Sequence, residues 1–281
     1  MLRANAKAMP ILSPSPRART SRQVSKLFDM KARAARRDRA ARMGVETFLF
    51  ERAFGDCLER IEMLGHLSDR ALLVGCPDSG WPRRLQALSR SVTATDPGPH
   101  FACAVNGETV IEDEWASLPQ GFGLICAVGT LDTVNALPLA LRLLSEALEP
   151  GGLLIGAMSG GETLPLLRRA KAAADRAADA ASAHTHPRIE ASALAPLLSD
   201  AGLVRPVVDI DRVDVAYSSF DRLISDLRRM GATNVLEQRP RTGIRKGGVA
   251  AARAEFEAAR LNGRATETFE ILHFAAWKPP R

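Results

Sequence analysis

The segment from Leu137 to Glu162 constrains the fold more than any other part of the chain, because it reads as a helix, a stop and a strand. Apolar residues recur at helical spacing on one face of its first half, at Leu139, Leu143, Leu144, Ala147 and Leu148. Pro150-Gly151-Gly152 predicts the end of this helix, since proline cannot continue it and glycine accepts a left-handed cap. The short apolar run over 153–158 then predicts a buried strand.

A helix that feeds a strand through a glycine turn is half of a βαβ unit, so the fold class expected is α/β with a mostly parallel sheet. Further strands are predicted over 71–75, 91–96, 108–114, 123–128, 206–217 and 268–277. The last two predict an antiparallel hairpin at one edge of the sheet, with a helical insertion at about 218–262 between them. We expect a basic tail over 1–25, N-terminal helices over 26–68 and one domain over 69–281.

Positive charge is concentrated near the N-terminus. Residues 1–45 carry twelve Lys and Arg against two Asp, whereas the net charge of the whole chain is only +6, so the remainder is net acidic. With only 5% aromatic residues, such a body argues against nucleic acid as a partner. The composition of 1–25 is compatible with a mitochondrial transit peptide or with a disordered tail, and both interpretations stay open.

Metal and membrane signals are weak. The four cysteines lack CxxC spacing, and the pair His184-Thr185-His186 would need a third ligand from elsewhere, so no metal site is expected. No apolar run reaches the roughly 18 residues of a transmembrane helix.

Eight sequence pieces share their order and spacing with one protein family. They are FD at 28–29, RRDRAAR at 36–42, VNALP at 134–138, GGETL at 160–164, PRI at 187–189, AGLVRPVVDIDRVDVAY at 201–217, DLRRMGATNVL at 226–236 and GRATETFEILHFAAWKP at 263–279. From residue 27 onward the chain resembles a branch of the class I methyltransferases, which use S-adenosylmethionine (SAM). This branch contains the complex I assembly factor 5 proteins and their bacterial relatives.

The resemblance implies a Rossmann-like sheet of seven strands with an antiparallel last strand, SAM as cofactor, and transfer of a methyl group to a protein or small molecule. The alternative is a catalytically degenerate assembly factor that binds a respiratory-chain protein as its client. The location implied is the mitochondrial matrix for a eukaryotic chain and the cytoplasm for a bacterial one.

The loop after the first strand is where the family binds the methionine part of SAM. Here it reads Gly75-Cys76-Pro77-Asp78-Ser79-Gly80, and Pro77 stands where a glycine is expected. Proline has no N–H to offer a ligand, and Leu73 replaces the usual acidic residue. Gly75, Cys76, Asp78 and Gly80 remain the candidate cofactor contacts, but the altered loop favours the assembly-factor alternative.

Three acidic residues follow predicted strands. Asp96 lies 21 residues after Gly75, where a carboxylate would accept both ribose hydroxyls of the cofactor, although a turn residue before Pro97-Gly98 is an equal interpretation. Glu112 and Asp113 end the third predicted strand, where they would meet the adenine; a solvated strand end is the favoured interpretation. Ala127, at the end of the fourth strand, completes the cofactor candidates.

The remaining candidates belong to the acceptor side of the site. Asp132 stands where the family carries a histidine and is the candidate catalytic residue, although no general base is evident. Glu162 and Thr163 follow the fifth strand, and Glu162 would either contact substrate or cap the next helix. Arg229 and Asn234 are candidate lid residues within a basic segment predicted to form a lid or partner surface. That segment contains Arg228, Arg229, Arg239, Arg241, Arg245 and Lys246.

Overall fold

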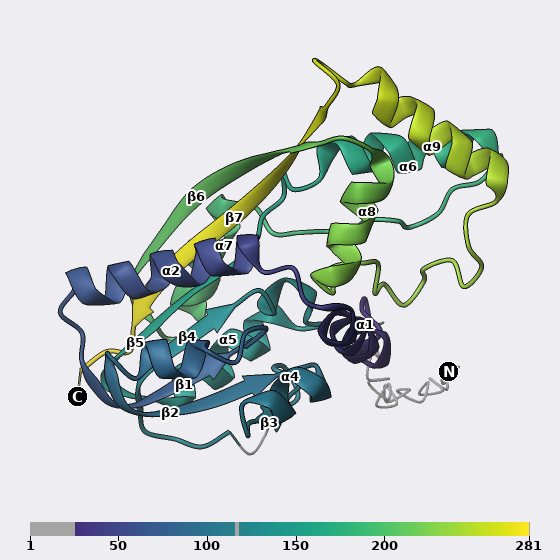
Figure 1. Ribbon diagram of the computed structural model, residues 1–281. Helices are drawn as coiled ribbons and strands as arrows, with labels where there is room; N and C mark the ends of the chain where they lie inside the picture. Colours follow the sequence, from purple (N-terminus) through teal and green to yellow (C-terminus); the bar gives the residue numbers. More distant parts are fainter. Residues whose placement is uncertain (1–25, 116–117, 281) are drawn as a thin grey trace, which may run out of the picture.

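The computed structural model describes residues 26–115 and 118–280 (Figure 1). Its sheet has seven strands in the order β3-β2-β1-β4-β5-β7-β6. The strands are β1 (Ser68–Val74), β2 (Ser89–Asp96), β3 (Glu108–Thr109), β4 (Phe122–Val128), β5 (Leu148–Ser159), β6 (Val204–Tyr217) and β7 (Ala265–Trp277). β7 runs antiparallel to both β5 and β6, and the other pairs are parallel, which confirms the predicted fold class.

Helices cover both faces of the sheet. α2 (Phe48–Met63) and α3 (Trp81–Leu85) pack on one face, and α5 (Leu137–Ala147) and α7 (Ala191–Asp200) pack on the other. The cause is apolar spacing, since the buried residues of α2 recur every three or four positions at Ala53, Phe54, Cys57 and Ile61. The sheet is therefore buried on both faces, as parallel sheets usually are.

Helix α5, in the segment from Leu137 to Glu162, differs in two details from the prediction. α5 buries Ala140, Leu141 and Leu144, whereas Leu139 is 42% exposed. The helix ends at Ala147, before Pro150-Gly151-Gly152, which lie inside the first residues of β5. Here the register of β5 against β4 shifts, and Gly151 adopts a φ of +81°. The prolyl-glycyl turn thus shapes the start of the strand rather than capping the helix.

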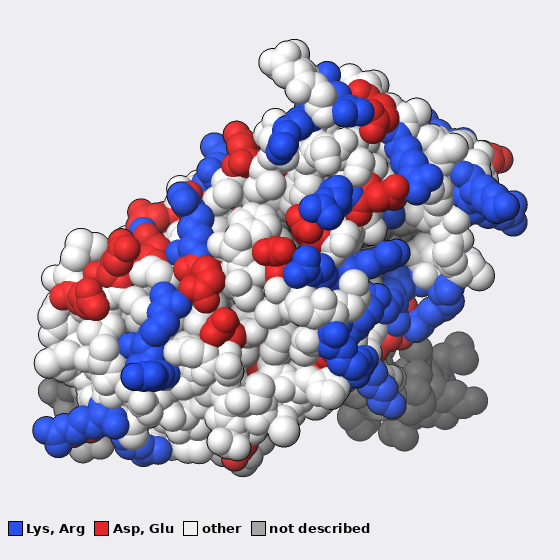
Figure 2. Space-filling model, viewed as in Figure 1, with Lys and Arg blue, Asp and Glu red and all other residues white. Residues whose placement is uncertain are grey.

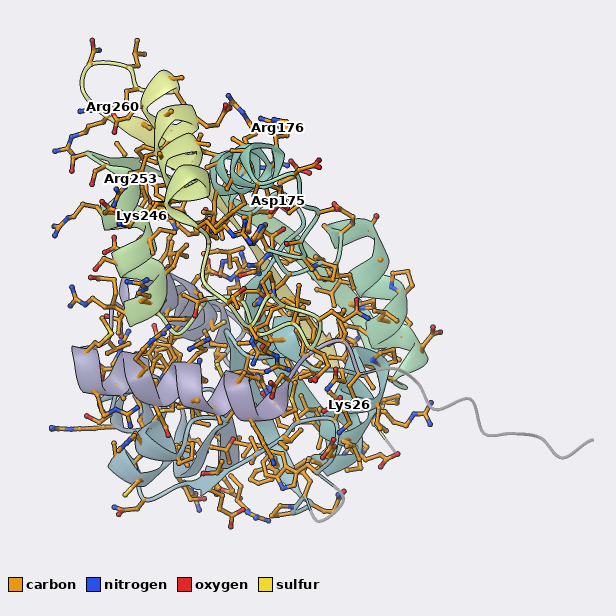
Figure 3. All side chains as sticks on the ribbon, turned by 90° about the vertical axis from the view of Figure 1, so that its right-hand side faces the viewer. Lys26, Asp175, Arg176, Lys246, Arg253 and Arg260 are labelled. Carbon is orange, nitrogen blue, oxygen red and sulfur yellow. The ribbon has the colours of Figure 1, made fainter. Side chains whose placement is uncertain are left out.

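A second group of helices extends beyond the end of the sheet. α6 (Pro165–Ala177), α8 (Phe220–Arg229) and α9 (Lys246–Ala258) share a hydrophobic cluster with the far ends of β6 and β7 (Figures 1 and 3). α8 and α9 both lie between β6 and β7 in the chain.

α1 (Met30–Met43) lies across the carboxyl ends of the parallel strands, between α4 (Pro99–Ala104) and α8. Asp29 caps it by accepting a hydrogen bond from the Ala32 N–H at 2.9 Å. The short 3₁₀ helix η1 (Leu131–Thr133) follows β4 on the same side of the sheet. This placement puts the arginines of α1 over the strand ends.

The third strand is shorter than predicted. β3 contains only Glu108 and Thr109, so the expectation of a strand over 108–114 was wrong for 110–114. Glu112 and Asp113 are 1% and 7% exposed, so the favoured interpretation of a solvated strand end was also wrong. The two carboxylates are buried because groups distant in sequence bind them, as described below.

Within the described residues, no helix is long and apolar enough to span a membrane.

Candidate functional site

Asp96, at the carboxyl end of β2, is completely buried beneath α1. Arg37 donates to both of its oxygens, with Nε 2.6 Å from Oδ1 and Nη2 bonded to Oδ2. The backbone N–H groups of Cys76 and Gly98 donate to the same carboxylate at 2.8 and 2.7 Å. Asp96 therefore accepts four hydrogen bonds from this chain, two of which form a bidentate ion pair with Arg37.

Glu112 is held in the same way by a second arginine of α1. Arg33 donates from Nη1 and Nη2 to the two carboxylate oxygens at 2.6 and 2.8 Å. Its remaining donors reach the carbonyl oxygen of Thr130 at 2.6 Å and Oγ1 of Thr133 at 2.9 Å. Neither side chain of this pair is more than 4% exposed. α1 is thus tied to the ends of the sheet by two buried ion pairs one helical turn apart.

Asp113 accepts a hydrogen bond from the start of α5, and its Oδ1 is buried without a partner among the described residues. Its Oδ2 accepts a hydrogen bond from the Ala136 N–H at 2.7 Å. Ala127 is likewise buried within β4 and belongs to the core of the sheet.

The loop after β1 is closed by contacts of its own. Gly75 has a φ of +87°, and a Cβ there would lie 2.3 Å from the carbonyl oxygen of Val128. The Cys76 thiol donates to the Asp78 carbonyl at 3.2 Å, and burial raises its pKa to about 12. Oδ1 of Asp78 accepts from the Gly80 N–H at 2.7 Å. The loop is therefore folded against the end of β4 as a compact turn.

These contacts bear on SAM, the cofactor that the resemblance implies. Asp96 and Glu112 are the carboxylates expected to meet its ribose and adenine, and α1 places a guanidinium against each of them. Gly75 is pressed against β4 at the point where the cofactor would approach the backbone. In this conformation the two carboxylates are therefore bonded to arginines of α1, and SAM could bind them only if those arginines moved away.

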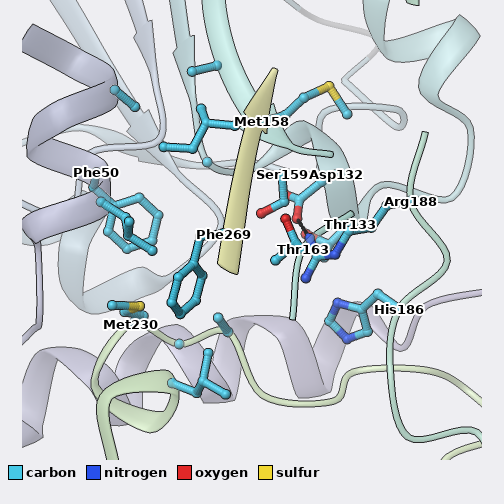
Figure 4. A pocket seen from close by; sticks show the side chains of 18 of the residues that line it. Phe50, Asp132, Thr133, Met158, Ser159, Thr163, His186, Arg188, Met230 and Phe269 are labelled. Atoms are coloured by element: carbon cyan, nitrogen blue, oxygen red, sulfur yellow. Dashed lines mark hydrogen bonds and ion pairs between the residues drawn. The ribbon is translucent and has the colours of Figure 1, made fainter. Parts of the chain in front are cut away.

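A cavity of about 100 Å³ lies beside these strand ends, bounded by α1, α2, the ends of β4 and β5, and the segment 186–188 (Figure 4). One wall is apolar and includes Phe50, Met230 and Phe269. The opposite wall is polar and includes Asp132, Thr133, Ser159, Thr163, His186 and Arg188. The cavity thus suits a molecule with an apolar body and a polar end.

Asp132 lines this polar wall as one member of a buried ion pair. Nη1 of Arg188 donates to its Oδ2 at 2.9 Å, and the side chains are 7% and 11% exposed. Burial lowers the pKa of Arg188, and Asp132 opposes that effect. The carboxylate is therefore already neutralised by its partner, which positions it in the wall.

His186 lies next to this pair and was not a predicted site residue. Its Nε2 accepts a hydrogen bond from the Val235 N–H at 3.0 Å, which requires a neutral ring. Burial lowers its pKa to about 4, with a further decrease from Arg188. The sequence signal for both residues was the stretch 184–189, in which we considered His184 and His186 only as an incomplete metal pair and Pro187–Ile189 only as a family motif.

The segment after β5 is held by acids of β7. Oγ1 of Thr163 donates to the Glu270 carbonyl oxygen at 2.9 Å, whereas the exposed Glu162 contributes only its N–H, 3.3 Å from Oε1 of Glu270. Glu267 accepts from the N–H groups of Leu166 and Leu167 at 3.1 and 2.8 Å. The predicted alternative that Glu162 caps this helix was wrong, because α6 begins two residues later than expected and Glu267 reaches its N-terminus.

The two candidate lid residues point to different places. Arg229 turns away from the cavity and donates from Nε to the Gly44 carbonyl at 2.8 Å. Asn234 donates to the Ala183 carbonyl at 2.6 Å and lines a second hollow beside the cavity. The fold therefore brings Asp132 and Thr163 together in the cavity wall and separates them from Arg229.

The methyltransferase-domain family matches residues 33–205 of this chain. The Danio rerio protein named "Arginine-hydroxylase NDUFAF5, mitochondrial" is 28% identical over 99% of this chain and 91% of its own length. The Xylella fastidiosa malonyl-[acyl-carrier protein] O-methyltransferase is 32% identical over 58% of this chain and 53% of its own length. These matches confirm the predicted family resemblance, and the domain match supports SAM as the cofactor.

The fold has solved counterparts. The Bacillus halodurans protein BH2331, which carries a provisional methyltransferase name, superposes with a TM-score of 0.52 at 11% sequence identity, over 80% of this chain and 99% of its own. At this identity the likeness concerns the fold alone, and it agrees with the strand order described above.

Proposed function

Because this chain belongs to the methyltransferase-domain family, we propose that it is a SAM-dependent methyltransferase whose acceptor binds in the cavity beneath α1. The observation that carries the proposal is the position of the cavity. It adjoins Gly129 and Thr133 after β4, Ser159 at the end of β5, and Arg33 and Arg37, which hold the candidate cofactor carboxylates. In open α/β sheets, ligands bind at this edge of the sheet.

In this proposal, α1 controls access of the cofactor. Asp96, Glu112 and the loop from Gly75 to Gly80 remain the contacts for SAM, but α1 must withdraw Arg33 and Arg37 before SAM can bind. If the open state is a minor one, the apparent affinity for SAM is reduced by the fraction of open molecules. The chain's own arginines would then compete with the cofactor.

The acceptor remains a protein side chain or a small molecule. The polar wall supplies the Asp132–Arg188 pair and the hydroxyls of Thr133 and Ser159, which would orient a polar end. The apolar wall, with Phe50 and Phe269, would hold its body and exclude water from it. Asp132 is thus proposed as a positioning residue for the acceptor.

The cellular location and the client of this chain are further parts of the proposal. The Danio rerio relative is named as a mitochondrial protein, which supports a mitochondrial location for a chain of eukaryotic origin. The matrix in that case, and the cytoplasm for a bacterial chain, stay predictions from the resemblance. A respiratory-chain protein as the client of this chain follows only from the resemblance to the complex I assembly factor 5 proteins, and it stays part of the proposal.

The test is a calorimetric titration with SAM and with S-adenosylhomocysteine. The wild-type chain is compared with a double variant, Arg33→Met and Arg37→Met, and with Lys31→Met as a control on an exposed position of the same helix. We expect the double variant to bind both ligands at least about tenfold more tightly than the wild type and the control, because the competing guanidinium groups are gone.

Hydrogen exchange provides a second measurement that does not depend on a variant. Saturating SAM should increase amide exchange in α1 of the wild-type chain, because the helix has to leave the strand ends. If neither the wild type nor any variant binds the cofactor at concentrations up to millimolar, the proposal is refuted. The alternative, an assembly factor without catalytic activity, would then be favoured. Tight binding to the wild type with unchanged exchange in α1 would refute only the role of α1.

A further inference from the structure

A second hollow of about 320 Å³ lies beside the cavity, between α1, α6, α8 and the segment 232–244. We call it the basic groove. Five of its lining side chains are cations that form no ion pair among the described residues: Arg36, Arg39, Arg168, Lys171 and Arg228. None of the described residues that line it is Asp or Glu. Figure 2 shows Lys and Arg gathered over the region where α1 and α8 meet.

The hydrogen bonds of these cations leave their charge uncompensated. Arg39 donates to Oγ1 of Thr233 at 2.9 Å, and Arg168 donates to the Gly161 carbonyl at 2.9 Å, so both partners are neutral. The Nε atoms of Arg36 and Arg39 are buried and have no hydrogen-bond partner in the described part of the chain. A buried donor without a partner costs about 1–3 kcal/mol, so the groove is destabilised as it stands.

The cations also repel one another. The pKa of Lys171 is lowered by burial and then by Arg228, and Asp175, which does not line the groove, opposes this decrease. Burial, Arg36 and Arg228 together lower the pKa of Arg39. The other two arginines that line the groove are different, because Arg188 pairs with Asp132 and Arg239 pairs with Asp29. Arg188 and Arg239 thus each have an acidic partner, whereas no described acidic residue lines the groove beside the other cations.

We propose that the basic groove binds a small molecule that bears phosphate groups. Guanidinium and ammonium donors from three helices converge on one hollow, which matches a compact, multiply charged anion. An acidic peptide would instead match a strip of cations along an open surface.

The groove also lies directly beside the cavity. Both are lined by Thr163, Leu164, His186, Arg188, Leu227 and Ala232. A ligand anchored by its phosphate in the groove would therefore extend its other end into the cavity. This assignment of the ligand as the acceptor rests on the proposed function, whereas anion binding itself does not.

The experiment uses inorganic pyrophosphate as the probe and the full-length chain without SAM. Binding is measured by calorimetry and by thermal shift at constant ionic strength, with sodium chloride as the reference salt. The variants are Arg228→Gln and Lys171→Gln. Arg176→Gln is the matched control, because Arg176 lies on the exposed end of α6 and does not line the groove (Figure 3).

We expect pyrophosphate to raise the melting temperature of the wild type beyond the effect of the reference salt. Each groove variant should bind it roughly 10- to 100-fold more weakly, the order expected for the loss of one charged hydrogen bond. The Arg176→Gln control should stay within about twofold of the wild type. Without ligand, the groove variants should melt no lower than the wild type, because the substitutions remove repulsion.

Two results would overturn the proposal. One is a pyrophosphate effect that is no larger than that of the reference salt or that is equal in the wild type and all variants. The other is binding of a polyglutamate peptide in the absence of any pyrophosphate binding, which would assign the groove to an acidic protein segment. Because no SAM is present, failure here is separate from failure of the proposed methyltransferase function.

Discussion

Removal of either member of the buried ion pair between Arg37 and Asp96 should destabilise the fold by several kcal/mol, and a double-mutant cycle can measure the coupling energy between the two residues. The two substitutions are Arg37→Met and Asp96→Asn, made singly and together. Both side chains are at most 7% exposed, and the contact is bidentate. Removal of one member of such a pair leaves the other charge buried without its partner, which typically costs about 3–5 kcal/mol.

The contacts of each residue determine how large the loss in free energy of unfolding should be for each single variant. In Arg37→Met, Asp96 keeps two hydrogen bonds from the backbone of Cys76 and Gly98, so the loss should be near the lower limit, about 3 kcal/mol. In Asp96→Asn, the buried guanidinium loses its charged partner, and we expect a similar loss. The double variant buries neither charge alone, so it should be less destabilised than the sum by about 2–4 kcal/mol.

The assay is urea unfolding of all four proteins, with the free energies of unfolding extrapolated to water. Arg52 and Asp211 provide a matched control, because they form a similar contact on the surface, with side chains 57% and 24% exposed. The coupling energy of that pair should be about 0.2–1 kcal/mol. A coupling energy for Arg37 and Asp96 no larger than that of the control would refute the conclusion that α1 is fastened to the sheet by this contact.

Three further predictions concern the surroundings of the site. His186 has a lowered pKa of about 4 in the folded state against an ordinary value of 6.5, so the folded chain resists its protonation. Stability from this group is therefore lost as the pH falls from about 6.5 to 4, by roughly 3 kcal/mol in total, and His186→Gln should flatten the stability profile measured by urea unfolding in that window. Glu267→Ala should lower the free energy of unfolding by about 1–3 kcal/mol, because two N–H groups of α6 lose their acceptor. Glu267→Gln should lower it less, and equal losses of the two variants in urea unfolding would contradict the capping role. Gly75→Ala should cost at least about 1–3 kcal/mol in the same assay, since its φ is +87° and the new Cβ would meet a carbonyl oxygen; a neutral substitution would mean that the loop moves freely.

Elements that depend on local sequence were predicted well. The apolar runs over 71–74, 123–128 and 153–158 lie in β1, β4 and β5, because a parallel strand buried on both faces must be apolar along its whole length. The helical insertion is visible in the sequence for a similar reason. Its two helices, α8 and α9, each present an apolar stripe to the same cluster.

The partners of the buried acids could not be predicted, because they are distant in the chain. Asp96 was predicted correctly as a strand-end acid, whereas Glu112 lies beyond the end of β3, and Arg37 and Arg33, which bind these two acids, lie 59 and 79 residues before them. A helix cap was one of two candidate roles for Glu162. In the structure Glu267, on a strand 100 residues after Leu167, caps this helix instead. A pattern of nearby residues contains no information on such pairs.

The sequence by itself therefore determined the α/β class, the order of its seven strands, and the family to which the chain belongs, because these follow from periodicity and from motifs in register. Only the tertiary structure decided which charges meet. It placed Arg33 and Arg37 on the candidate cofactor acids and left Arg36, Arg39, Lys171 and Arg228 together without an acid. The physical reason is that an ion pair depends on distance in space, which the sheet and α1 establish only when the whole chain is packed.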